Sequence, residues 1–175
     1  ITVHHFSSPM WVDDFLREAG CEDDEDPTDT DLCGWDHPKG ADLIIEELAE
    51  HAALLARTYG DRVDEWCTIN EPINYIFASY GFTVFPPAMI LAILNPTGLV
   101  DSLRNYVRAH VAIYRAIKEN DTVDADGDGS AADVGLSLSI AEWAPARNGD
   151  PSDLEVDIQA ADRLWYAYHF LIPDS

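Results

Sequence analysis

The sequence predicts an α/β domain in which parallel strands alternate with amphipathic helices. Strand-like runs rich in β-branched residues stand at 1–6, 63–69 and 134–140, and apolar residues at helical spacing fill long segments between them. Strands separated by long helices form parallel βαβ units, because a parallel pair needs a crossover connection. Periodicity leaves an α/β barrel and a doubly wound sheet open. No Gly-rich phosphate loop follows any strand, which disfavours a nucleotide-binding fold.

The first half of the chain begins with a strand and continues into a long helix. Residues 1–6 alternate as a strand does, and Pro9 follows soon after. Residues 20–40 are acidic and punctuated by Gly and Pro, so we expect an acidic loop insertion there. From 41 to 59 the apolar residues fall on one helical stripe, and Gly60 is the expected stop.

The second half repeats this order. The apolar run at 63–69 predicts a strand, and residues 99–118 place their apolar side chains on one helical face. An Asp/Gly-rich loop is expected at 120–133, followed by an alternating strand at 134–140. A Ser-x-x-Glu capping box then predicts a third helix over 152–170.

The composition restricts the partners. The formal net charge of −23 repels polyanions, so neither nucleic acid nor an anionic membrane surface is an expected partner. No run of about 18 apolar residues predicts a membrane span. The chain begins at Ile1, without Met and inside a strand, so we expect a piece of a longer protein.

The three cysteines leave the compartment open. Cys21 and Cys33 bracket the acidic segment, and a disulfide between them would favour a secreted or periplasmic location. Two free thiols are the alternative. Cys67 stands in an apolar strand and is most simply a small buried hydrophobe.

Polar side chains follow the first two predicted strands. In a parallel barrel, active sites lie at the C-terminal ends of the strands. His5 ends the first strand, and Asn70 and Glu71 end the second. A carboxylic acid suits protonation of a leaving oxygen, and Asn and His can hydrogen-bond sugar hydroxyls. Alternatively, Glu71 caps the helix that follows and His5 is a satisfied core histidine.

The motif TINEP at 68–72 resembles the acid/base signature of glycoside hydrolase family 1, the β-glucosidase family. Related barrel glycosidases share Asn-Glu-Pro, but further segments are similar to the family in the same order. They are TVHHFSSPMWV, GW at 34–35, ELAEHAALLARTYGDRVDEW, SYG at 79–81, FPP at 85–87, RNYVRAHVAIYRAIK and VGLSLSIAEWAP. This resemblance covers nearly the whole chain. It implies that residues 1–175 form one partial (β/α)8 TIM barrel domain, holding about the third to fifth strands.

The resemblance also implies roles for individual residues. Glu71 matches the general acid/base, Asn70 the amide that binds the sugar 2-hydroxyl, and His5 the histidine that binds the glycone hydroxyls. His4 matches no assigned role, and Ser139 stands where many members carry Asn. The implied activity is retaining hydrolysis of terminal β-linked sugars, as in a β-glucosidase acting on a small β-glycoside or oligosaccharide.

One part of the family's chemistry is not found in this sequence. A retaining enzyme needs a second carboxylate about 5–5.5 Å from the first, and the family's Glu-Asn-Gly nucleophile motif does not occur here. We therefore expect the 175-residue chain alone to be inactive, with the rest of the barrel outside it. The alternative is a non-catalytic carbohydrate- or calcium-binding module derived from such a barrel.

The Asp/Gly-rich loop has the spacing of a calcium site. Positions 1, 3, 5 and 6 of an EF-hand-like loop are occupied by Asp124, Asp126, Asp128 and Gly129. Position 12 is Gly135 rather than Glu, so Asp133 or a residue elsewhere would have to complete the shell. A solvated acidic turn is the alternative. No cofactor is expected for catalysis, so a calcium ion here would be structural.

Overall fold

The computed structural model describes residues 1–14, 21, 26–139, 150 and 152. The helices and strands discussed below all lie in one compact unit, residues 1–138. Apart from its first residue, the helix expected over 152–170 lies outside the described part of the chain. None of the helices in that part is long and apolar enough to cross a membrane.

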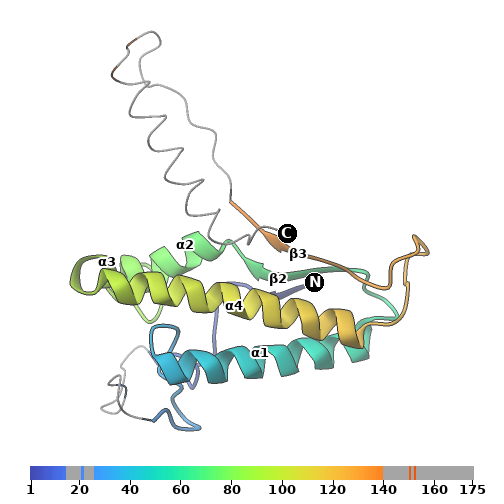
Figure 1. Cartoon of the computed structure of the whole chain (residues 1–175), viewed down its shortest axis with the longest axis horizontal. Helices are drawn as coiled ribbons and strands as arrows, with labels where there is room; N and C mark the ends of the chain where they lie inside the picture. The colour runs from blue at the N-terminus through green and yellow to red at the C-terminus, as the bar shows by residue number, and fades with distance from the viewer. Residues whose placement is uncertain (15–20, 22–25, 140–149, 151, 153–175) are drawn as a thin grey trace. The chain divides into compact units, whose positions relative to one another are not determined.

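The sheet is parallel, as the sequence predicts (Figure 1). Its strands, in spatial order, are β1 (Thr2–His4), β2 (Glu65–Asn70) and β3 (Asp133–Ser137). His4 pairs with Ile69, and Asn70 pairs with Ser137, past a register shift in β2. The C-terminal ends of all three strands therefore meet at one edge of the sheet.

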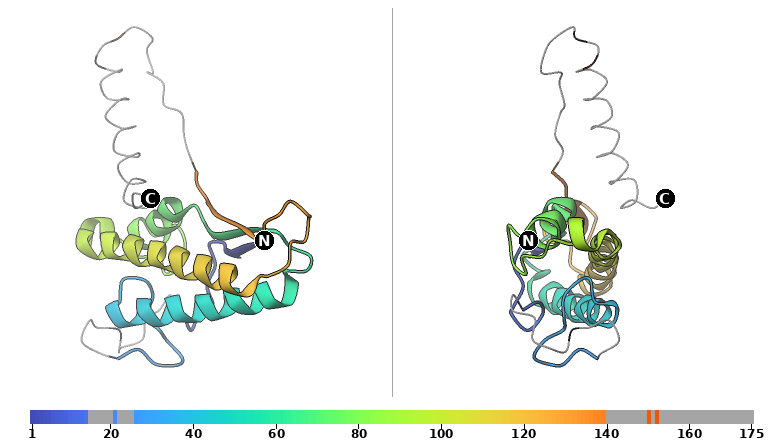
Figure 2. Two further views of the ribbon diagram at one scale, coloured as in Figure 1. Left: turned by 45° about the vertical axis from the view of Figure 1, so that its right-hand side comes forward. Right: turned by 90° about the vertical axis from the view of Figure 1, so that its left-hand side faces the viewer.

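Two long helices connect the strands: α1 (Pro38–Tyr59) and α4 (Pro96–Asn120). They lie side by side and run in the same direction, as Figure 1 and the left view of Figure 2 show. Ion pairing joins Arg108 to Asp42 near the start of α1, and Arg57 bonds Asn120 at the ends of both helices. This direction is the one that two consecutive parallel βαβ units require.

The acidic loop is shorter than predicted. Its expected end at residue 40 is wrong, because α1 begins at Pro38. Proline is accepted in the first turn of a helix, where its missing N–H has no partner in any case. His37 caps the turn, since its Nδ1 accepts a hydrogen bond from the Gly40 N–H at 3.0 Å. The Asp/Gly-rich loop is likewise shorter than predicted at both ends, because α4 extends to Asn120 and β3 starts at Asp133.

Gly60 ends α1 as predicted, but for a different reason. Its φ of −58° is ordinary helical backbone, so no left-handed turn requires glycine there. A Cβ at Gly60 would lie 2.2 Å from Oδ1 of Asp121. The Asp121 carboxylate is buried and accepts a hydrogen bond from Trp66 Nε1 at 2.9 Å. Glycine is needed because this carboxylate packs directly against the end of α1.

Three short helices lie between β2 and α4, and only a helix directly after Glu71 was anticipated from the sequence. They are α2 (Pro72–Ile76), the π-helix η1 (Phe77–Gly81) and α3 (Leu91–Leu94). The Pro86–Pro87 peptide between them is cis. Segments of four or five residues are shorter than the window in which helical periodicity can be recognised.

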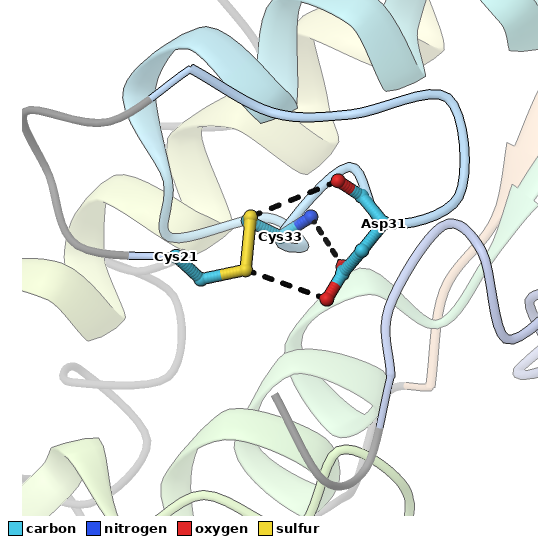
Figure 3. Close-up of side chains that lie close together, drawn as sticks. All are labelled: Cys21, Asp31 and Cys33. Atoms are coloured by element: carbon cyan, nitrogen blue, oxygen red, sulfur yellow. Dashed lines mark hydrogen bonds between the residues drawn. A yellow bond between two sulfur atoms is a disulfide. The ribbon is translucent and has the colours of Figure 1, made fainter. Parts of the chain in front are cut away.

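The acidic loop is closed by a disulfide between Cys21 and Cys33 (Figure 3). Asp31 lies against this bond: its Oδ1 accepts from the Cys33 N–H at 2.8 Å. Of the two alternatives, the structure contains the disulfide, while the compartment stays a prediction. Cys67 is a free thiol in β2, half-buried rather than fully buried.

Candidate active site

Glu71 occupies the turn between β2 and α2. Its backbone is left-handed, with φ 42° and ψ 63°, which few residues other than glycine adopt. The Glu71 N–H donates to the Ser137 carbonyl at 2.9 Å, and its carbonyl accepts from the Tyr75 N–H at 3.0 Å. Pro72 is pre-set for the first helical position. The turn is thus tied to both β3 and α2, and a strained, well-held residue of this kind is typical of functional sites.

The carboxylate of Glu71 does not cap the helix. Although Glu71 is the N-cap residue of α2, its side chain accepts no hydrogen bond from a backbone N–H there. Its Oε2 instead accepts from Nδ2 of Asn74 at 3.1 Å. The capping alternative is therefore wrong for this side chain, which is half-buried. No described residue hydrogen-bonds its other oxygen, Oε1.

Asn70 and His5 lie at the same strand edge as Glu71. They directly follow the paired residues Ile69 and His4. Asn70 is largely buried, whereas His5 is exposed and contacts the Phe6 ring edge-on. Within the part of the chain that the structure describes, no hydrogen bond engages either side chain. Both can therefore bind a hydroxyl-rich ligand without first breaking an internal bond.

The core histidine of this pair is His4, not His5. Its Nδ1 is hydrogen-bonded to the Tyr106 hydroxyl at 2.7 Å and its Nε2 to the Ser8 hydroxyl at 3.1 Å. Burial, together with the charge of His5, lowers the pKa of His4 from 6.5 to about 4. His4 is therefore neutral near pH 7 and belongs to the scaffold. The alternative that placed His5 in the core is wrong.

Aromatic side chains pack together next to the Glu71 turn. Tyr75 stacks on Phe6 with ring centroids 5.9 Å apart, and its ring lies 4.9 Å from that of Tyr106. Burial raises the pKa of Tyr75 to about 12, so its hydroxyl stays protonated. Sequence reasoning missed Tyr75 and Asn74. The available signal was their spacing, since they follow Glu71 by four and three residues in a helix that begins there.

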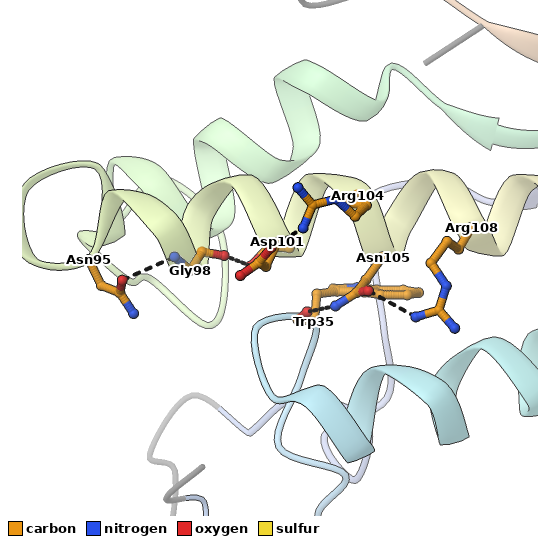
Figure 4. Close-up of polar contacts among 8 residues, drawn as sticks. Trp35, Asn95, Gly98, Asp101, Arg104, Asn105 and Arg108 are labelled. Carbon is orange, nitrogen blue, oxygen red and sulfur yellow. Dashed lines mark hydrogen bonds and ion pairs between the residues drawn. The ribbon is translucent and has the colours of Figure 1, made fainter. Parts of the chain in front are cut away.

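Hydrogen bonds around Trp35 hold the loop that precedes α1. Trp35 is fully buried, and its backbone N–H donates to the Tyr80 hydroxyl at 2.9 Å. The Tyr80 hydroxyl in turn donates to the carboxylate of Asp13. On the other side, the side-chain amide of Asn105 donates to the Trp35 carbonyl at 3.0 Å (Figure 4). These contacts connect the loop to η1 and α4.

The predicted calcium ligands come together around a residue that the sequence did not indicate. Asp64, just before β2, lies with Asp124 and Asp126 in one group and with Asp128 and Asp133 in another; within each group the ligand atoms are less than 4.8 Å apart. The Asp124 carboxylate also accepts backbone N–H bonds within the loop. The Asp128 N–H lowers the pKa of Asp126, but desolvation and the nearby carboxylates outweigh it and raise that pKa. Calcium binding here stays a prediction.

Comparison with known proteins points to one family. The family model described as "Glycosyl hydrolase family 1" matches residues 28–171. A β-galactosidase of Pyrococcus woesei is 32% identical over 167 residues, covering 93% of this chain and 29% of that relative. A coniferin β-glucosidase of Pinus contorta is 26% identical and is covered to 30% of its length, against 95% of this chain.

Solved structures agree on the fold. The structure of Fpglu1 from Fervidobacterium pennivoraus superposes with a TM-score of 0.68 at 26% identity, covering 97% of this chain and 31% of that one. A β-glycosidase from Thermosphaera aggregans gives a TM-score of 0.64 at 21% identity, covering 96% and 30%. These likenesses confirm the predicted partial (β/α)8 barrel. The chain spans about a third or less of the length of each of these relatives.

Proposed function

The chain belongs to glycosyl hydrolase family 1, and on that premise we propose that the whole protein hydrolyses terminal β-linked sugars. The proposed substrate is a β-D-glucoside, as a small glycoside or an oligosaccharide, cleaved with retention of configuration. One observation carries this proposal. The Glu71 carboxylate stands at the strand edge, on a left-handed backbone, and is not used to cap the helix it precedes.

Glu71 acts as the general acid and then as the general base. Its protonated carboxyl donates to the glycosidic oxygen while a second carboxylate attacks the anomeric carbon, which breaks the glycosidic bond and forms a glycosyl-enzyme. Ionised Glu71 then takes a proton from a water that attacks the anomeric carbon; the bond from the sugar to the second carboxylate breaks, the sugar is released, and the acid is regenerated. In this proposal the second carboxylate is supplied by a part of the whole protein outside residues 1–175.

Asn70 and His5 hold the sugar. The amide of Asn70 binds the 2-hydroxyl, and such hydrogen bonds strengthen as the transition state forms. His5 binds other hydroxyls of the terminal sugar. This assignment is supported by their place beside Glu71 and by their hydrogen-bonding groups, which no other described residue engages.

Replacement of the acid tests the proposal. In the whole protein, we expect Glu71→Gln to lower kcat/KM on phenyl β-glucoside by about 10²- to 10⁴-fold, the usual effect of general acid–base catalysis. Glu65→Gln is the matched control, because Glu65 is exposed at the start of the same strand and should leave activity unchanged. The isolated 175-residue chain should release no phenol.

The non-catalytic alternative makes a different prediction. A carbohydrate-binding module would retain glucoside in equilibrium dialysis but release no phenol as the whole protein, with or without Glu71. Turnover that is unchanged in Glu71→Gln would also refute the assigned role, since another group would then be protonating the leaving oxygen.

A further inference from the structure

Asn74 is the one described residue whose side chain hydrogen-bonds the Glu71 carboxylate. Asn74 is the third residue of α2, and residues three apart on a helix are neighbours on its surface. Its Nδ2 lies 3.1 Å from Oε2 of Glu71. The Asn74 side chain is exposed and makes no other hydrogen bond to a described residue.

The chemistry of this contact is directional. An amide nitrogen is only a donor, so Oε2 has to act as the acceptor whether Glu71 is ionised or protonated. In a protonated carboxyl the carbonyl oxygen is the better acceptor, so this contact favours Oε1 as the oxygen that carries the transferable proton. Because the Glu71 backbone is fixed by the Ser137 and Tyr75 bonds, one further bond to Oε2 restricts how the carboxyl group can rotate.

We propose that Asn74 is a positioning residue for the acid/base: it holds Oε2 of Glu71 and leaves Oε1 to exchange the proton with the substrate. This inference rests on the proposed function of Glu71 and deepens it. In this role Asn74 touches neither the sugar nor the reacting atoms. It acts through Glu71, and its effect should follow the demand of each substrate for protonation.

Two leaving groups separate this role from a structural one. Phenyl β-glucoside needs its leaving oxygen protonated, whereas 2,4-dinitrophenyl β-glucoside has a leaving group stable enough to depart without a proton. In the whole protein, we expect Asn74→Leu to lower kcat/KM about tenfold on the phenyl substrate, the usual scale for losing a hydrogen bond to a charged group. The same variant should change the dinitrophenyl value less than about twofold, and Asn74→Gln should recover part of the loss.

Asn105→Leu is the matched control. It removes a side-chain amide bond of similar length, to the Trp35 carbonyl, and should affect both substrates equally. Equal losses on both substrates in Asn74→Leu would overturn the proposal, as would no loss on either.

The proposed function fails differently. If Glu71→Gln does not reduce phenyl glucoside hydrolysis, or the whole protein cleaves neither substrate, then the acid/base role of Glu71 is wrong and the role of Asn74 falls with it. A selective loss in Glu71→Gln without one in Asn74→Leu removes the positioning role alone.

Discussion

The buried histidine beside the site should make the fold sensitive to mild acid. Burial places the pKa of His4 at about 4 in the folded chain, against 6.5 for an ordinary histidine. The folded state therefore prefers neutral His4, and protons bind more readily to the unfolded state. The contribution to stability is complete above pH 6.5 and is lost as the pH falls toward 4.

The magnitude follows from that interval. At about 1.4 kcal/mol per pH unit, the difference between a pKa of 6.5 and one of about 4 amounts to about 3 to 4 kcal/mol in the acid limit. Between pH 7 and pH 5 the linkage relation gives a loss of about 2 kcal/mol from His4 alone. Protonation would make both ring nitrogens donors, so the hydroxyl of Tyr106 or Ser8 that donates to the neutral ring would have to turn and accept instead.

Urea unfolding followed by tryptophan fluorescence at the two pH values measures this loss. The non-titrating variant His4→Gln should lose about 2 kcal/mol less than the wild-type chain over the same interval. His5→Gln is the control, because His5 is exposed and should keep nearly the wild-type pH dependence. If His4→Gln and wild type lose the same free energy of unfolding between pH 7 and pH 5, burial of His4 is not the cause and the reasoning is refuted.

Two further predictions concern the scaffold. Gly60→Ala should destabilise the chain by about 2 kcal/mol in urea unfolding, since the new Cβ would overlap the buried Asp121 carboxylate. Gly135→Ala is the control: its Cβ meets nothing within 4 Å, so it should change the free energy of unfolding by less than about 0.5 kcal/mol. Equal effects of the two substitutions would contradict the packing argument. If the aspartate loop binds Ca²⁺ with a Kd of about 0.1 mM, then 1 mM Ca²⁺ should stabilise the chain by about 1.4 kcal/mol in the same assay. Asp124→Asn should abolish that gain, and a wild-type chain that does not respond would leave the loop a solvated acidic turn.

The order of the long elements could be predicted because each is marked by periodicity over many residues. The place of Glu71 followed from the same logic, since a polar residue ending a buried strand lies at the edge where parallel strands end. The sequence alone could not decide which of His4 and His5 is buried. Alternation puts neighbouring strand residues on opposite faces, but which face is covered depends on the packing of α4.

Other features depended on contacts between segments far apart in the chain. Asp64 joins the aspartate loop only because β2 and β3 pair. Gly60 is explained by Asp121, more than fifty residues away, and no local pattern announces such an approach. The short helices after Pro72 lie below the length at which periodicity is informative.

The hydrogen bond from the Glu71 N–H to Ser137 has a consequence for how this segment tolerates change. The register of β3 is set next to the loop, where the Asp133 N–H bonds the Asp64 carbonyl, and along the pairs that follow. Residues added to or removed from the exposed turn around Gly127 and Gly129 would change the loop before Asp133 without shifting the register of β3. Evolutionary changes in the length of this loop should therefore leave the position of Glu71 unchanged. A single-residue insertion inside β3, in contrast, would displace the Ser137 carbonyl that accepts from the Glu71 N–H.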